Sequence, residues 1–188
     1  MLTSTALLAL MLQLSPPEAT TSLSLPSEGH ETLEARTARY ESIADDVLVV
    51  ANSDPPLFRG TNAIDRTALL LLVTTYFESS GWHWAVDTGA KLGDHGRSWC
   101  IAQIHLPGAR RTPEGWAGPD LIEDRRKCLR ASMRVLRASL ALCTRRPQAD
   151  RLAPYLSGSC FVAVDDSRRR WVVFQHALRQ VESWMLSG

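Results

Sequence analysis

The sequence lacks a strong net charge, a long apolar run and an internal repeat, and each absence excludes a class of proteins. Its 21 Lys and Arg against 20 Asp and Glu leave a formal net charge of only +1, so no overall charge points to nucleic acid as a partner. No apolar run reaches the roughly 20 residues of a transmembrane helix, and we expect no stable membrane insertion. There is no internal repeat or heptad array. With 188 residues, 45% of them hydrophobic, the chain is long enough for one compact globular domain.

The spacings that hold metal ions, phosphates or catalytic thiols are also missing. His83, His95, Cys100 and His105 form no Cys-x2-Cys or His-Glu-x2-His pattern, which zinc sites normally show. The segment 92–96, Leu-Gly-Asp-His-Gly, lacks the glycine spacing and the Lys of a phosphate loop. Nothing around Cys100 is typical of a cysteine protease. We therefore expect no metal and no other cofactor.

The small net charge conceals an uneven distribution. Residues 1–65 contain three Arg and nine acidic residues, for a charge of −6, whereas residues 66–188 contain 18 basic and 11 acidic residues, for a charge of +7. Nearly all of the basic residues are Arg. A genomic preference for Arg codons explains this excess, and a surface suited to a polyanion such as a bacterial cell wall is the functional alternative.

Hydrophobic spacing predicts a mostly α fold (α+β) with one small β element. Helical periodicity covers 31–51, and the helix predicted over 63–79 is apolar nearly all round, so it should lie in the middle of a core. Frequent Gly and turn signals over 82–118 predict a small β-hairpin or irregular lobe. Further helical patterns cover 119–144, begin again near 150, and cover 167–185.

The first 14 residues form an apolar run of the length of a signal-peptide core, although no Lys or Arg precedes it. This run is either an export signal or an N-terminal helix packed on the domain. The Ser-, Thr- and Pro-rich residues 15–30 are typical of a linker. We divide the chain into residues 1–30, an apolar segment with its linker, and residues 31–188, the main domain. We expect an exported, periplasmic or extracellular protein.

Four cysteines predict two disulfides in an exported chain. Cys128 and Cys143 should not pair, because one helix carrying both would separate them by ~22 Å, against about 6 Å between the Cα atoms of a bridge. Two connectivities remain. We favour Cys100–Cys128 with Cys143–Cys160 over Cys100–Cys143 with Cys128–Cys160. Free thiols in a cytosolic protein are the alternative.

Glu78 is the outstanding candidate for chemistry. It ends the apolar helix and directly precedes Ser79-Ser80-Gly81-Trp82. A carboxylate beside so much apolar surface is costly to ionise, so its pKa should rise, and a protonated carboxyl group can give a proton to a leaving oxygen. The alternative is a residue at a helix end that reaches water.

Three short motifs occur in an order that resembles a known family. They are Glu-Ser-Ser-Gly at 78–81, Cys-Ile-Ala-Gln-Ile at 100–104, and Ala-Pro-Tyr-Leu-Ser-Gly at 153–158. Over about residues 66–160 the chain resembles lytic transglycosylases and goose-type lysozymes. The resemblance implies a lysozyme-like helical domain with a small β-hairpin lobe, which cleaves peptidoglycan glycan strands between N-acetylmuramic acid and N-acetylglucosamine as a monomer.

The resemblance also implies roles for single residues. Glu78 matches the catalytic acid, and Ser79, Gln103 and Tyr155 match residues near the substrate. Trp82 and Trp84, in the loop-rich segment, are candidates to stack on sugar rings, although tryptophans there could equally fill the core of the lobe.

A lytic transglycosylase works with one Glu, and this is the mechanism that we favour. A hydrolytic lysozyme usually needs a second carboxylate, for which Asp87 and Asp94 are the candidates. The alternative to an enzyme is a lysozyme-like domain that has lost activity and binds glycan or a protein partner.

Overall fold

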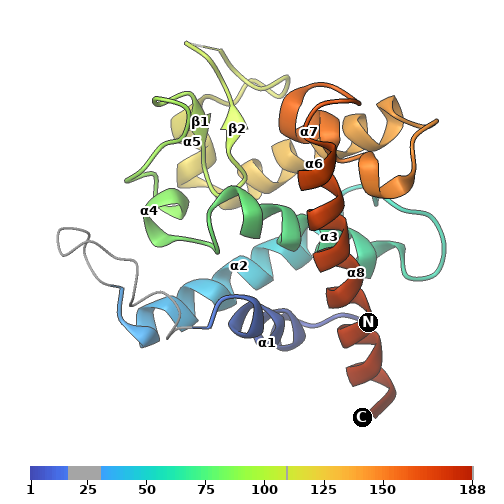
Figure 1. Cartoon of the computed structure of the whole chain (residues 1–188). Helices are drawn as coiled ribbons and strands as arrows, with labels where there is room; N and C mark the ends of the chain where they lie inside the picture. Colours follow the sequence, from blue (N-terminus) through green and yellow to red (C-terminus); the bar gives the residue numbers. More distant parts are fainter. Residues whose placement is uncertain (17–30, 109, 188) are drawn as a thin grey trace.

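The structure, a computed structural model, describes residues 1–16, 31–108 and 110–187. It confirms a mostly helical chain with a small antiparallel sheet of two strands. The linker predicted for 15–30 lies, from residue 17 onward, outside the described residues. The elements are α1 (Ser4–Leu14), α2 (Leu33–Ser53), α3 (Ala63–Glu78), α4 (Trp84–Asp87), β1 (Ser98–Trp99), β2 (Ile104–His105), α5 (Gly118–Glu123), α6 (Arg125–Leu142), η2 (Gln148–Asp150), α7 (Ala153–Ser157) and α8 (Val164–Ser187), as Figure 1 shows.

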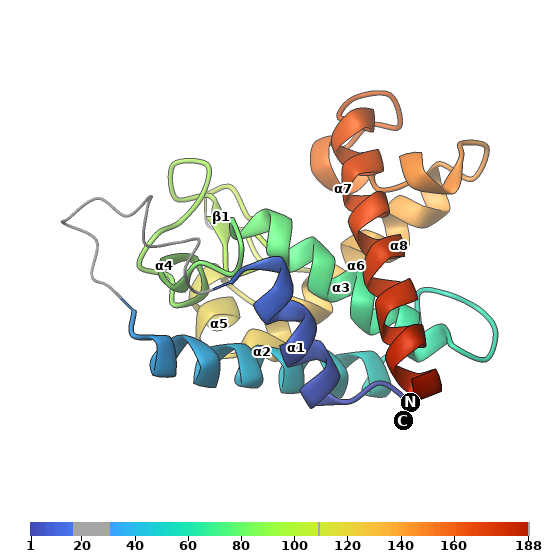
Figure 2. The ribbon, with the colours of Figure 1, turned by 60° about the horizontal axis from the view of Figure 1, so that its bottom comes forward.

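The core is built around α3. Ten of its sixteen residues are buried, as expected for a helix that is apolar on all sides. Helices α2, α6 and α8 all pack against it, and Figure 2 shows α2 running beneath α3 while α8 crosses it. The carboxyl end of α3, where Glu78 lies, is therefore held by the packing of the whole domain.

The N-terminal segment forms a helix that packs on the domain. Thr3 caps α1 by accepting a hydrogen bond from the backbone of Ala6 at 3.2 Å. Leu7, Leu10 and Met11 are completely buried, and α1 packs against α2. In the described part of the chain, no helix combines the length and the apolar character that crossing a membrane would require.

The single helix predicted over 119–144 is in fact two helices, so this prediction was wrong in one detail. Asp124 leaves the helical conformation between α5 and α6, with φ −127° and ψ 97°. Its side chain accepts a hydrogen bond from the backbone of Arg126 at 3.0 Å, which is the role of an N-cap. The break is local, and Cys128 still lies in the first turn of α6 while Cys143 is the C-cap at its other end.

Three of the six basic residues of α6 pair with acidic residues of the N-terminal part of the chain. Arg125 and Arg126 both pair with Asp46 of α2 at 2.7 Å, and Arg130 pairs with Asp54 at 3.2 Å. The opposite charges of the two parts of the sequence therefore meet where α2 packs against α6. These pairs give three of the arginines of residues 66–188 a role in packing.

A small lobe follows α3. Strands β1 and β2 pair Ser98 with His105 and Trp99 with Ile104. Trp99 lies so close to Gly118 that a Cβ there would be 2.1 Å from the indole ring, so only glycine permits this approach.

Both disulfides of the favoured pairing are present. Cys100–Cys128 joins the lobe to α6, with 6.2 Å between the Cα atoms. Cys143–Cys160 joins the end of α6 to the segment before α8, with 5.8 Å between the Cα atoms. The described cysteines include no free thiol, so Cys100 is neither a thiol nucleophile nor a zinc ligand. Bridges of this kind are compatible with an oxidising compartment.

Candidate active site

A cleft with a volume of about 1150 Å³ brings together residues from distant parts of the sequence. Its lining includes Glu78 from the end of α3, Gln103 from the small lobe, Tyr155 from α7 and Arg170 from α8. Asp94 also lines it. Three residues that the motifs singled out, Glu78, Gln103 and Tyr155, therefore share one cavity although 77 positions separate the first from the last.

The surroundings of Glu78 raise the pKa of its carboxyl group. Its side chain is only 17% exposed, and its Oε1 atom accepts a hydrogen bond from Nη1 of Arg170 at 2.5 Å. Burial raises the pKa of the Glu78 carboxyl, and this effect outweighs the ion pair with Arg170, which lowers it. The negative charge of Asp94 adds to the rise.

Ser79 and Trp82 stabilise the turn that follows Glu78. The hydroxyl of Ser79 donates to the carbonyl of Thr75 at 2.6 Å and accepts from the backbone N–H of Trp82 at 2.9 Å. Ser79 and Trp82 are completely buried, and the indole N–H of Trp82 donates to the hydroxyl of Thr75 at 3.0 Å. Both residues therefore hold Glu78 at the helix end, and neither can touch a substrate.

Gln103 is placed by the small lobe. Its side-chain amide donates to the carbonyl of Cys100 at 3.0 Å, and its Oε1 atom approaches Gly93 so closely that a Cβ at residue 93 would be 1.9 Å away. Glycine at 93 is required for this side-chain position. The Cys100–Cys128 bridge anchors the segment that carries Gln103 to α6.

Tyr155 ties three elements together at the cleft. Its hydroxyl donates to the carbonyl of Ala102 at 2.9 Å and lies 3.2 Å from the hydroxyl of Ser132 on α6. Burial first, and the negative charge of Glu78 second, raise the pKa of Tyr155 well above its ordinary value. The phenol therefore stays protonated and keeps its hydrogen bond to the lobe. It is the one Phe, Tyr or Trp side chain that the described residues contribute to the cleft lining.

Backbone strain gathers around the same cavity. Seven described residues other than glycine have φ between 48° and 60°, a conformation that costs about 1–3 kcal/mol per residue and tends to occur at functional sites. Three of them line the cleft, and the others are close in sequence to a residue that does. The seven are Ser80, Trp82, Asp94, His95, Cys100, Gln103 and Ala163.

Asp94 is a solvated carboxylate within the cleft. The hydroxyl of Ser98 donates to it at 2.5 Å, and this hydrogen bond, with His105 and Arg97, holds the pKa of the Asp94 carboxyl below its ordinary value. Nδ1 of His105 lies 3.4 Å from both Ser98 and Asp94. The arrangement is no nucleophilic triad, because a triad places the imidazole between the serine and the carboxylate.

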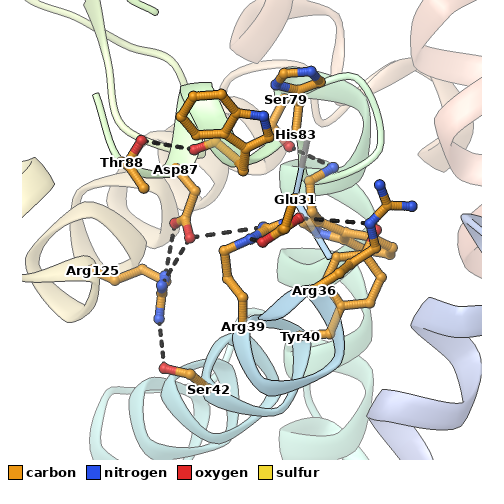
Figure 3. A network of polar contacts seen from close by, with 12 residues as sticks. Glu31, Arg36, Arg39, Tyr40, Ser42, Ser79, His83, Asp87, Thr88 and Arg125 are labelled. Atoms are coloured by element: carbon orange, nitrogen blue, oxygen red, sulfur yellow. Dashed lines mark hydrogen bonds and ion pairs between the residues drawn. The ribbon is translucent and has the colours of Figure 1, made fainter. Parts of the chain in front are cut away.

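Asp87 lies outside the cleft, in a polar network beneath α4. Its two oxygens accept hydrogen bonds from Arg125 at 2.8 and 2.9 Å, and Arg39 lies 3.8 Å away. Figure 3 shows Asp87 between these two arginines, with Ser42 beside Arg125. The carboxylate is 8% exposed and joins α4 to α2 and α6, so the structure gives it no place in a reaction within the cleft.

An Asp87→Asn variant is expected to lose about 3 kcal/mol of unfolding free energy. This is the lower end of the cost of breaking a buried ion pair, because Arg125 keeps its second partner, Asp46. Urea denaturation measures the loss. Asp165→Asn is the matched control, since it removes an exposed i,i+3 pair and should change stability by less than about 0.5 kcal/mol. Equal stability of the two variants would contradict the structural role of Asp87.

Trp84 is also absent from the cleft lining. It is partly exposed, and the centroid of its indole ring lies 6.1 Å from the centroid of the His83 imidazole ring. In the described part of the chain, no three His, Cys, Asp or Glu side chains group to hold a metal ion.

Sequence reasoning missed Arg170, which makes the shortest contact to Glu78. A signal was present, because Arg170 falls at the helical spacing of the buried residues Phe174, Ala177 and Val181. A lone Arg on the apolar stripe of a helix needs a buried acidic partner. The sequence alone does not say which acid this is.

Comparisons of the chain with protein-family models, curated protein sequences and solved structures found no match.

Proposed function

We propose that this chain is a lysozyme-like lytic transglycosylase that cleaves the glycan strands of peptidoglycan with Glu78 as its catalytic acid. The observation that carries the proposal is a buried carboxyl group of raised pKa at the wall of a cleft that Gln103 and Tyr155 also line. A helical domain with a small two-stranded lobe beside the cleft is the arrangement that the motif resemblance implies.

The proposed reaction begins with proton transfer from Glu78 to the oxygen of the glycosidic bond. The bond between this oxygen and C1 of N-acetylmuramic acid breaks, and the electron pair stays on the oxygen. The 6-hydroxyl of the same sugar then attacks C1 and returns its proton to the Glu78 carboxylate. The product carries a 1,6-anhydro ring, and the enzyme regains its starting protonation state.

Hydrolysis is the second candidate, and the position of Asp94 favours it. This ionised carboxylate shares the cleft with Glu78, so it could activate a water molecule in place of the 6-hydroxyl. Asp87 does not offer this alternative, because its oxygens are bound to Arg125 outside the cleft.

Incubation with purified peptidoglycan, followed by mass spectrometry of the products, tests the proposal. We expect anhydro products that are lighter by one water than hydrolysed ones, and an Asp94→Asn variant should retain most of the activity. Products with new reducing ends, together with loss of activity in Asp94→Asn, would establish hydrolysis. Binding of the glycan without any cleavage would show that the chain is an inactive glycan-binding domain.

The disulfides agree with export, which this substrate requires. Peptidoglycan lies outside the cytoplasm, where bridges such as Cys100–Cys128 and Cys143–Cys160 persist. We therefore propose a periplasmic or extracellular location.

A further inference from the structure

The shortest described contact of Glu78 is an ion pair with Arg170, which opposes protonation of the carboxyl group. Arg170 reaches it from α8, 92 positions further along the chain, at 2.5 Å. The Arg170 side chain is only 13% exposed, and its guanidinium lies over the ring of Phe77, 5.1 Å from the centroid. The pair is thus enclosed by protein, where its charges interact more strongly than they would on the surface.

Two opposite influences act on this carboxyl group. Burial favours the protonated form, whereas a guanidinium at hydrogen-bond distance favours the carboxylate. The titratable groups that act on Glu78 are Arg170 from α8 and Asp94 from the small lobe, and Glu78 in turn raises the pKa of Tyr155 from α7. The other charged or titratable residues of the cleft lining are His105, Arg110, Arg111, Arg134 and Asp166.

We propose that Arg170 is a positioning residue that favours the carboxylate of Glu78 in the empty cleft, and that substrate binding separates the pair so that Glu78 takes up the proton that it donates. The inference rests on the proposed function, because it concerns the same acid. While Nη1 of Arg170 lies 2.5 Å from Oε1 of Glu78, it stabilises the charged form of the carboxyl group. Separation of the pair removes this stabilisation, and burial then favours the acid form more strongly.

The guanidinium of Arg170 also carries an N–H group that could bind the substrate when the contact with Glu78 is broken. Nε of Arg170 is buried and has no hydrogen-bond acceptor among the described residues. A buried donor without an acceptor is costly. In the proposed exchange, the guanidinium turns toward the cleft and donates to an oxygen atom of the bound glycan.

The titration of Glu78 itself tests the inference without any assay of cleavage. With ¹³C-labelled glutamate, the carboxyl signal of Glu78 is followed against pH by NMR. In Arg170→Gln the pKa of Glu78 should rise by about 1–3 units relative to the wild type, because an opposite charge within 4–6 Å lowers it by that amount. Arg170→Lys keeps the charge and should titrate close to the wild type. Arg169→Gln is the matched control, since Arg169 is 70% exposed and pairs with Asp166, and it should leave the titration unchanged.

The pH dependence of kcat/KM provides a second test, because the same shift should appear in the rate of cleavage. Activity falls as pH rises through the pKa of the acid in the free enzyme, so this fall should move to higher pH in Arg170→Gln by the same interval as the NMR titration. An unmoved or lowered Glu78 titration, or the same shift in Arg170→Lys, would overturn the inference. A shifted titration in a protein that cleaves no glycan would support the role of Arg170 and refute the proposed function.

Discussion

Glu78→Gln is expected to lower the rate of peptidoglycan cleavage by about 10²–10⁴-fold, the usual contribution of general acid catalysis. Glutamine has nearly the same shape, but its amide cannot supply the proton that the leaving oxygen needs. The rate is measured as the clearing of a suspension of purified peptidoglycan. Because Gln can still accept a hydrogen bond from Arg170, the fold should be retained, which thermal melting would verify.

Glu123→Gln is the matched control for this variant. Glu123 ends α5, is exposed and does not line the cleft, so the same chemical change there should leave the rate unaltered. A Glu78→Gln protein that clears the wall at nearly the wild-type rate would show that another group supplies the proton. Equal losses in the two variants would indicate a general effect of the substitution.

Removal of the Cys100–Cys128 bridge, by Ala at both positions, is expected to lower the unfolding free energy by about 2–5 kcal/mol. The bridge closes a loop with a sequence separation of 28 between two buried residues. Activity should fall as well, because the bridge anchors the segment that places Gln103 in the cleft. Denaturation in urea measures the first effect, and the clearing assay at a temperature where the variant is folded measures the second.

Removal of the Cys143–Cys160 bridge, which has a sequence separation of 17, gives the comparison for stability. Its loss should fall in the same range, since the entropy of loop closure changes slowly with length. Mass spectrometry of the unreduced, alkylated protein decides whether the bridges exist. Four alkylated thiols in protein folded under oxidising conditions would contradict both bridges and the argument for export.

The local features of this chain could be predicted because they depend on neighbours in the sequence. The all-round apolar character of residues 63–79 predicted a central helix, and α3 is that helix. The rise per residue of a helix was enough to exclude a Cys128–Cys143 bridge. The position of Glu78 at the end of α3 was visible for the same reason, since helix ends and apolar periodicity are properties of a short window.

The two aspartates show where such reasoning ends. Asp87 and Asp94 both lie in turn-like sequence, and nothing local separates them. The structure binds Asp87 to Arg125, 38 positions away, whereas Asp94 faces the cleft. Which carboxylate reaches the solvent depends on the packing of α4 against α2 and α6.

The sequence by itself determined the central helix and the place of Glu78 at its end, but it left open whether that carboxyl group reaches water. Only the tertiary structure decided that Trp82 fills the core and that Arg170 is the partner of Glu78. The physical reason is the distance along the sequence over which each kind of interaction acts. Helix propensity, capping and hydrophobic periodicity act over a few residues, whereas burial and ion pairing depend on which distant segments meet. The 92 positions between Glu78 and Arg170 are bridged only when α8 packs across α3.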